Sequence, residues 1–278
     1  MNTFLTVGFH ARAAMASLLL LLGCVLAAPA LAEAPTSVFL EDLTWTELRD
    51  AIASGKTTII VPIGGTEQNG PHMALGKHNV RVKLLSERIA LALGNAIVAP
   101  VIAYAPEGSV APPSEHMRFP GTITVPDAVF EQTLESAARS FKLHGFSDIV
   151  FLGDHGGYQD NDRAAADRLN REWTRSKTRA HAIDGYYAVT QHDYVEALKR
   201  RGLSAAEIGT HAGAADTSLT LALDPRLVRA EKLGAAPKPG AGEGVYGDPT
   251  RSSAELGQLG VDLIVVTTMA AIKAATAR

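Results

Sequence analysis

Short apolar runs that alternate with amphipathic stretches limit the fold of this chain more than any other feature. The runs at 57–62 (TTIIVP), 96–102 (AIVAPVI) and 147–152 (SDIVFL) are rich in β-branched residues and have the length of strands. Runs without polar alternation are buried on both faces, and helices between them favour parallel pairing. The pattern therefore predicts an α/β domain with a mostly parallel sheet that helices cover on both faces.

Helices are expected wherever apolar residues recur at helical spacing. Thr44 is a candidate N-cap for the first helix, and Gly257 and Gly260 weaken the first turns of the last one. A long loop rich in Gly and Pro, 234–249, precedes that last helix. The expected helices are 43–54, 79–93, 126–143, 160–177, 193–201, 214–223 and 254–277, and a further short strand is expected at 179–183.

The first 32 residues have the pattern of a secretory signal peptide. Arg12 supplies the positive charge, 13–26 is an apolar run too short for a comfortable membrane span, and 30–32 (ALA) suits signal peptidase. We expect cleavage after this segment, a mature domain of residues 33–278, and a periplasmic or secreted location. A lipoprotein anchored through Cys24, the single cysteine, is the weaker alternative because the residues before it fit a lipobox poorly.

Charge and motifs argue against several classes of function. The formal net charge is −3 without a long run of one sign, so we expect no nucleic-acid partner. We expect no integral membrane span in the mature domain. The glycine-rich segment 153–157 lacks the Gly-Lys-Ser/Thr signature of a phosphate loop, and the chain has no G-x-S-x-G elbow of a serine hydrolase.

Three polar clusters combine histidine, carboxylate and glycine. They are 64–78, which follows the first predicted strand, 153–157, which follows the third, and 210–218, which enters a helix. Sheets of this kind bind ligands at the carboxyl ends of their strands, and imidazoles and carboxylates are ligands for divalent metals. Each residue taken alone also suits an ordinary role, such as a surface histidine or Asp216 as a helix cap. Together the clusters predict a metal site.

These clusters resemble the motifs of the creatininase (creatinine amidohydrolase) family. Segment 62–78 resembles the family's Pro-x-Gly turn and the Glu-x-His-Gly-Pro-His motif after it, and 114–123 resembles its Ser-x-x-His-x-x-Phe-Pro-Gly-Thr stretch. Segment 154–157 matches Gly-His-Gly-Gly except at its first residue, and 211–218 resembles His-Ala-Gly-x-x-Glu-Thr-Ser. The resemblance implies a three-layer α/β/α sandwich, a divalent-metal hydrolase of non-peptide or cyclic amide C–N bonds, and a homo-oligomer, often a hexamer.

The resemblance also implies a set of metal ligands, from which this chain departs. Members typically hold two metals with Glu, His, a bridging Asp, a second His and a further Glu. Glu67 and His155 match this set. Asp216 is one methylene shorter than the later Glu, Asn69 replaces the first His, and His78 replaces the bridging Asp. A neutral imidazole offers one lone pair and cannot bridge two ions, so we predict a single metal. Its expected ligands are Glu67, His78, His155 and Asp216, with Asp154 as a reserve ligand or a partner that orients a histidine.

The resemblance implies an amidohydrolase acting on a small-molecule amide, and the signal-peptide pattern predicts that it is exported. The metal (zinc first, with manganese or iron as alternatives) would polarise the amide carbonyl and activate water. His211 is expected to protonate the leaving nitrogen, and His72 is a second acid–base candidate. His116 and Asn69 are expected to contact the substrate. The altered ligands leave an alternative open, a catalytically degenerate creatininase-fold protein that binds a small molecule or a metal without turnover.

Overall fold

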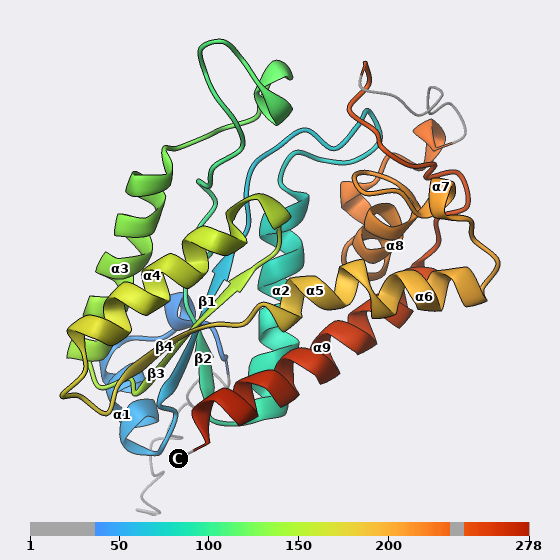
Figure 1. Cartoon of the computed structure of the whole chain (residues 1–278). Coiled ribbons are helices and arrows are strands. Elements are labelled where there is room, and N and C mark those ends of the chain that lie inside the picture. Colours follow the sequence, from blue (N-terminus) through green and yellow to red (C-terminus); the bar gives the residue numbers. More distant parts are fainter. Residues whose placement is uncertain (1–36, 234–241, 278) are drawn as a thin grey trace, which may run out of the picture. The chain divides into compact units, whose positions relative to one another are not determined.

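A single parallel sheet forms the centre of the domain. The structure, a computed structural model, describes residues 37–233 and 242–277, so the predicted signal peptide and Cys24 lie outside the described residues. The strands lie in the order β2-β1-β3-β4, and each neighbouring pair is parallel, which confirms the predicted mostly parallel sheet (Figure 1). The strands are β1 (Thr58–Ile63), β2 (Ala96–Val98), β3 (Asp148–Gly153) and β4 (Arg179–Ala182).

Most helices lie close to the predicted ranges, and two short ones, α5 and α7, were not predicted. The α-helices are α1 (Trp45–Ala53), α2 (Lys77–Leu93), α3 (Asp127–Leu143), α4 (Gln159–Glu172), α5 (Gly185–Gln191), α6 (Asp193–Arg200), α7 (Ala205–Ile208), α8 (Ala214–Leu223) and α9 (Ala254–Thr276). Short 3-10 turns are η1 (Leu40–Asp42), η2 (Glu115–Arg118), η3 (Gly156–Tyr158), η4 (Pro225–Leu227) and η5 (Ala230–Lys232).

Several boundaries differ from the prediction for local reasons. Strand β2 ends at Val98, two residues before Pro100, which has no backbone N–H to donate to the sheet. Helix α2 begins at Lys77, two residues earlier than predicted, so that its first turn contains both Lys77 and His78. The predicted cap of α1 is confirmed, because the Thr44 side chain accepts a hydrogen bond from the N–H of Glu47 in a capping box.

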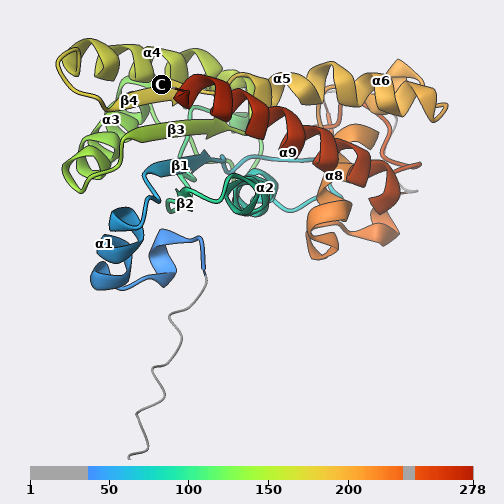
Figure 2. The same ribbon diagram turned by 90° about the horizontal axis from the view of Figure 1, so that it is seen from below.

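Successive side chains of a strand point to opposite faces of the sheet, and each face has its own layer of helices. Ile59 of β1 and Phe151 of β3 belong to the apolar core on the side of α3 and α4. Ile60 and Val150 belong to the core on the other side, which α2, α5 and α9 cover. Figure 2 shows these layers edge-on. The three-layer α/β/α sandwich is therefore confirmed.

Helix α9 is long and apolar enough to cross a bilayer by length and composition alone. Here it packs against α8, and a Cβ added at Gly257 would overlap the carbonyl oxygen of Ser218. The glycines that weaken the first turns of this helix thus allow two helices to approach closely. This contact holds α8, which carries Asp216, against the rest of the domain.

Candidate metal centre

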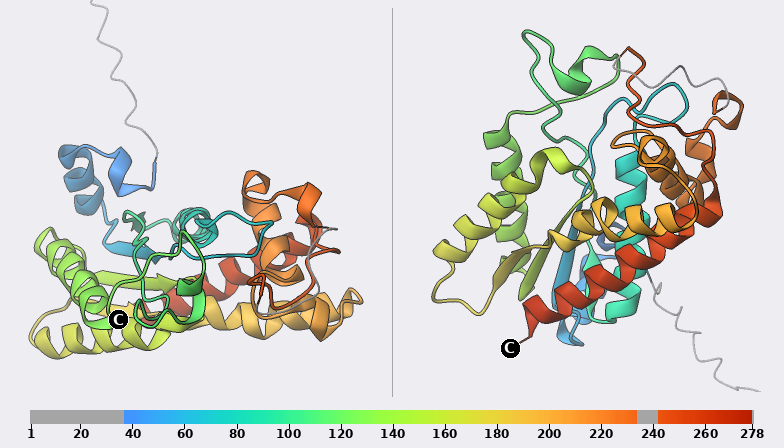
Figure 3. Two further views of the ribbon diagram at one scale, coloured as in Figure 1. Left: turned by 90° about the horizontal axis from the view of Figure 1, so that it is seen from above. Right: turned by 45° about the vertical axis from the view of Figure 1, so that its right-hand side comes forward.

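The loops at the carboxyl end of the sheet bring the polar clusters together. Glu67 lies in the loop after β1, and Asp154 and His155 directly follow β3. Segment 105–125, which follows β2, folds back over this end and is held to the β1 loop by a bridge between Thr66 and Ile123. Figure 3 (left) looks onto this end, where segment 105–125 (green) and the β1 loop (cyan) meet.

Four buried or half-buried side chains form a cluster suited to a metal ion, which we name the ligand cluster. One oxygen or nitrogen from each of Glu67, Glu107, His116 and His155 lies within 4.8 Å of the others. Glu67 Oε2 lies 3.1 Å from His116 Nε2 and 3.6 Å from His155 Nε2. Two carboxylates and two imidazoles are donors that suit zinc, manganese or iron.

The carboxylates of the ligand cluster have oxygens that no protein donor satisfies. Both oxygens of Glu107, and Oε2 of Glu67, are buried without a hydrogen-bond partner among the described residues. Burial, with the negative charge of Glu67 beside it, raises the pKa of Glu107 to about 9. Burial opposes ionisation of Glu67 as well, but His78 and His155 outweigh it and hold its pKa well below its usual range. Glu107 therefore keeps a proton that it can share with Glu67. A divalent cation between the two carboxylates would take the place of that proton, so the cluster fits a metal ion.

Gly65 makes room for one of these carboxylates. It has a φ of +146°, a backbone conformation that side chains rarely adopt. A Cβ placed there would overlap Glu107 Oε1. A glycine at this point of the β1 loop therefore lets Glu107 approach the end of β1.

A network of ion pairs lies next to the ligand cluster. Arg81 of α2 contacts Asp154 Oδ2 through Nε at 3.0 Å and Asp216 Oδ1 through Nη1 at 2.7 Å. Lys77 Nζ donates to Asp216 Oδ2 at 3.1 Å. Burial opposes the ionisation of both carboxylates, but these neighbouring cations outweigh it and lower the pKa of Asp154 and of Asp216. The two aspartates are thus already paired with protein cations.

His78 connects this network to the ligand cluster. Its Nδ1 lies 2.6 Å from Asp154 Oδ2, and its Nε2 lies 2.8 Å from Glu67 Oε1. Both ring nitrogens of His78 thus lie against carboxylate oxygens of the protein. This contact fixes the orientation of Glu67.

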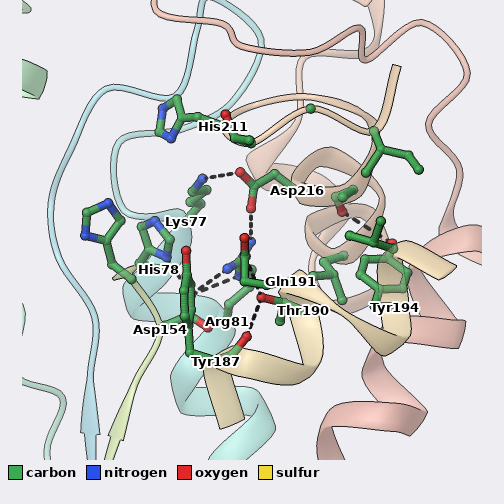
Figure 4. Close-up of a pocket in the computed structure, with 17 residues that line it drawn as sticks. Lys77, His78, Arg81, Asp154, Tyr187, Thr190, Gln191, Tyr194, His211 and Asp216 are labelled. Carbon is green, nitrogen blue, oxygen red and sulfur yellow. Dashed lines mark hydrogen bonds and ion pairs between the residues drawn. The ribbon is translucent and has the colours of Figure 1, made fainter. Parts of the chain in front are cut away.

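A polar cavity of about 70 Å³ opens beside the ligand cluster. His155, His211, Lys77 and Asp216 are part of its lining (Figure 4). Space of this size holds roughly five water-sized groups, so it admits a small polar group and not a large one. A wider hollow adjoins the cavity, shares Gly209 with it and is lined in part by apolar side chains.

His211 faces the cavity. Its Nδ1 lies 3.8 Å from Glu67 Oε1, and its Nε2 lies 3.0 Å from the backbone oxygen of Gln68. Burial, with the positive charge of Lys77 nearby, lowers the pKa of His211 to about 3. The ring is therefore neutral and has one nitrogen able to accept a proton.

The other predicted site residues divide between these groups. Glu67 and His155 lie in the ligand cluster together with His116, which was predicted to bind substrate. His78 and Asp216, predicted as ligands, lie in the ion-pair network, where His78 contacts Asp154 and Glu67 while Asp216 pairs with Lys77 and Arg81. Asp154 contacts His78 there, which is one of the two roles predicted for it.

Asn69 and His72 lie outside the cavity lining. Asn69 is buried and donates to the backbone oxygens of Glu67 and Ala74, which holds the β1 loop in shape. His72 is buried with Nε2 at 3.0 Å from Thr217 Oγ1, and burial lowers its pKa to about 4. It therefore ties the loop to α8 as a neutral ring.

Sequence reasoning missed Glu107, Lys77 and Arg81. Glu107 stands in an irregular stretch without a motif of its own, and only the fold-back of segment 105–125 brings it to the site. Lys77 and Arg81 form one side of α2 with His78, at a spacing of three and four residues. The available signal was that Lys77 belongs to the polar cluster 64–78, although basic residues on a helix are usually exposed.

Comparison with known proteins places the chain in a family. A family model described as creatininase (creatinine amidohydrolase) matches residues 41–272. The chain belongs to the creatininase family. It is 26% identical to the creatinine amidohydrolase of Pseudomonas putida over 205 residues, which cover 71% of this chain and 76% of that protein. The resemblance seen in the sequence motifs is therefore confirmed.

Further relatives act on different compounds, as their names state. The chain is 30% identical to the 3-dehydro-scyllo-inosose hydrolase of Thermotoga maritima, over 45% of this chain and 38% of that protein. It is 34% identical to the mycofactocin precursor peptide peptidase of Mycolicibacterium smegmatis, over 41% of this chain and 45% of that protein. The matching segments thus span less than half the length of these two relatives.

Solved structures of creatininases share the fold. A crystal structure of creatinine amidohydrolase superposes with a TM-score of 0.74 at 24% identity, covering 87% of this chain and 99% of that one. A structure named as creatininase with manganese gives a TM-score of 0.72 at 24% identity, over 87% of this chain and 100% of that one. A creatininase variant is described as Zn-Zn type.

Removing a ligand is expected to abolish tight metal binding. Glu107→Gln and His155→Ala each delete one donor, and we expect zinc affinity to fall by 10-fold or more, about 1.4 kcal/mol or above. Zinc content after dialysis and isothermal titration measure this effect. The matched controls are Glu115→Gln in the same segment and His144→Ala, both exposed, which should bind zinc as the wild type does. Unchanged zinc binding in both ligand variants would contradict this assignment.

Zinc affinity is also expected to rise with pH between about 6 and 8. Glu107, with its pKa raised to about 9 by burial, is protonated in the metal-free protein and must release that proton to bind. Burial lowers the pKa of His155 to about 4, so this ligand has no proton to lose in that range. We expect roughly a tenfold gain per pH unit in the wild type and a flatter profile in Glu107→Gln. A pH-independent affinity in the wild type would show that Glu107 is not a ligand.

Proposed function

We propose that this chain is a metal-dependent amidohydrolase that cleaves the C–N bond of a small polar amide. The observation that carries the proposal is the set of unpartnered, buried carboxylate oxygens of Glu67 and Glu107, which face His116 and His155 beside a polar cavity. Membership of a family whose relatives are hydrolases supports it, and so do relatives named for zinc and manganese.

The metal ion would supply the Lewis acid, and the protein side chains would position the groups of the site. A divalent ion held by the ligand cluster supplies a Lewis acid that polarises the amide carbonyl and makes water more acidic. His78, fixed by Asp154, keeps Glu67 turned toward that ion. The buried surroundings exclude bulk water, which strengthens the effect of each charge on the bound amide.

His211 is the group that we assign to proton transfer. As a neutral ring facing the cavity, it accepts a proton from the attacking water. The resulting hydroxide adds to the carbonyl carbon, and His211 returns the proton to the amide nitrogen as the C–N bond breaks. The products are a carboxylic acid, which passes its proton to the released amine, and that amine as its ammonium ion, and His211 ends neutral again.

The cavity supports a limit on the substrate. Its volume of about 70 Å³ and its polar lining suit a small head group that contains the amide. The adjoining hollow, partly lined by Val195 and Val245, can take a larger and less polar remainder. We therefore expect the amide to be near one end of the substrate.

Replacing His211 is expected to remove turnover but not metal binding. We would screen zinc-loaded residues 33–278 against small cyclic and acyclic amides, creatinine included, and detect products by mass spectrometry. His211→Ala should lower kcat by about 10²-fold or more because acid–base catalysis contributes that much. Its zinc content should not change. His192→Ala, an exposed histidine, is the control.

One outcome of that screen would favour the alternative function. If amides raise the melting temperature of the zinc-loaded protein in a saturable way and none yields product, the chain is a binding protein that has lost turnover. Product formation with the wild type that His211→Ala leaves unaltered would retain the hydrolase but remove His211 from the mechanism.

We also propose that the chain is exported, on the pattern of residues 1–32 alone. Expressed in full in a Gram-negative host, the protein should appear in the periplasmic fraction. N-terminal sequencing should give a chain that begins at Glu33. A cytoplasmic chain that retains residues 1–32 would contradict export, and a lipid-modified Cys24 would mean the lipoprotein alternative.

A further inference from the structure

Lys77 is a buried ammonium group inside the site. Its side chain is fully buried, and it lies in the first turn of α2 beside His78. Lysine is almost never fully buried unless carboxylates pair with it. Here Asp216 Oδ2 lies 3.1 Å from Nζ and Glu67 Oε1 lies 3.8 Å from it. The positive charge therefore lies between the β1 loop, which carries Glu67, and the first turn of α8, which carries Asp216.

Glu67 lies between the Lys77 ammonium group and the two histidines of the ligand cluster. Oε2 of Glu67 faces His116 and His155, whereas Oε1 faces His78 at 2.8 Å and Lys77 at 3.8 Å. Oε2 is thus available to a metal ion, whereas His78 and Lys77 surround Oε1.

The carboxylates on the Lys77 side have no oxygen left for a second ion. Asp216 Oδ1 pairs with Arg81, and its Oδ2 pairs with Lys77 and the N–H of Ala212. Asp154 Oδ2 contacts His78 and Arg81, and the hydroxyl of Tyr186 donates to its Oδ1 at 2.7 Å. These two carboxylates thus face two cations, Arg81 and Lys77. This balance leaves no net negative charge to attract a further divalent ion.

Lys77 nevertheless has N–H groups that make no hydrogen bond within the described part of the chain. An ammonium group has three N–H bonds, and within the described part of the chain only Asp216 lies at hydrogen-bond distance from Nζ. Lys77 lines the same cavity as His155 and His211, and Figure 4 shows it between His78, His211 and Asp216. A group bound in the cavity can therefore accept a hydrogen bond from it.

We propose that Lys77 is a catalytic residue that acts as a fixed second cation, in a site that holds one metal ion. This role rests on the proposed amide hydrolysis. As water adds to the carbonyl carbon, the carbonyl oxygen gains negative charge, and an N–H of Lys77 donates a hydrogen bond to it. When the C–N bond breaks, the carbonyl re-forms and the charge is lost. Lys77 stays protonated throughout, so the proton balance through His211 does not change.

The test compares two lysines of the same helix. Lys77→Met removes the buried ammonium group and keeps an unbranched side chain as far as the ε position. The control, Lys83→Met, removes an exposed charge that pairs with Glu41 on the surface. The probes are zinc alone, titrated by calorimetry and counted by elemental analysis, and 4-nitrophenyl acetate, whose ester carbonyl develops the same oxyanion.

We expect one zinc per chain in the wild type and in both variants. Hydrolysis of 4-nitrophenyl acetate should be zinc-dependent and about 10²-fold slower in Lys77→Met, the typical loss when one oxyanion donor is removed, and unchanged in Lys83→Met. In Lys77→Ala, added ethylammonium should restore part of the rate, which a purely structural lysine would not allow. Zinc content and circular dichroism show that each variant is folded.

Two results would overturn the role of Lys77. One is a wild type that binds two zinc ions with similar affinity, since Lys77 would then not stand in for a second ion, and this result needs no variant. The other is a zinc-loaded Lys77→Met with the full wild-type rate. Zinc dependence of the wild-type rate tests the hydrolase itself, so the two proposals fail separately.

Discussion

The buried carboxylate of Glu67 is the group on which the rest of this site depends. It lies in the loop after β1 with its side chain fully buried, and each of its oxygens faces a different set of partners. A buried anion without partners costs several kcal/mol, so the surroundings of each oxygen are constrained. His78 and Lys77 stabilise one oxygen from α2, while the other is left, with Glu107, for an ion. The parallel sheet places the partners of both Glu67 oxygens, because it brings the loops after β1, β2 and β3 to the same end of the domain.

The sheet could be predicted from sequence, and the site only in part. Buried apolar strands leave a local pattern, and Glu67 and His155, which follow two neighbouring strands, lie close together. Glu107 left no such pattern, because a fold-back of the chain after β2 carries it to the site. The role of His78 was also beyond the sequence, since it depends on Asp154 and Glu67, which the fold brings to it from two other loops.

The changes from the family's ligand pattern are consistent with one another. His78 makes hydrogen bonds to two carboxylates where a carboxylate was expected, and Lys77 and Arg81 pair with Asp154 and Asp216. Cations on the protein thus balance carboxylates that would otherwise need a metal. An altered ligand set therefore does not by itself indicate lost chemistry, because the charges of the site remain paired and a complete set of four donors persists beside them.

The most direct test of this account is a crystal structure of the zinc-loaded protein with anomalous data collected at the zinc edge. We predict one anomalous peak per chain, within bonding distance of Glu67, Glu107, His116 and His155. His78 should then remain hydrogen-bonded to Asp154, and Lys77 to Asp216. A peak between His78 and Asp216, or two peaks in one chain, would contradict the account, because the cations of α2 would then not occupy that side of Glu67.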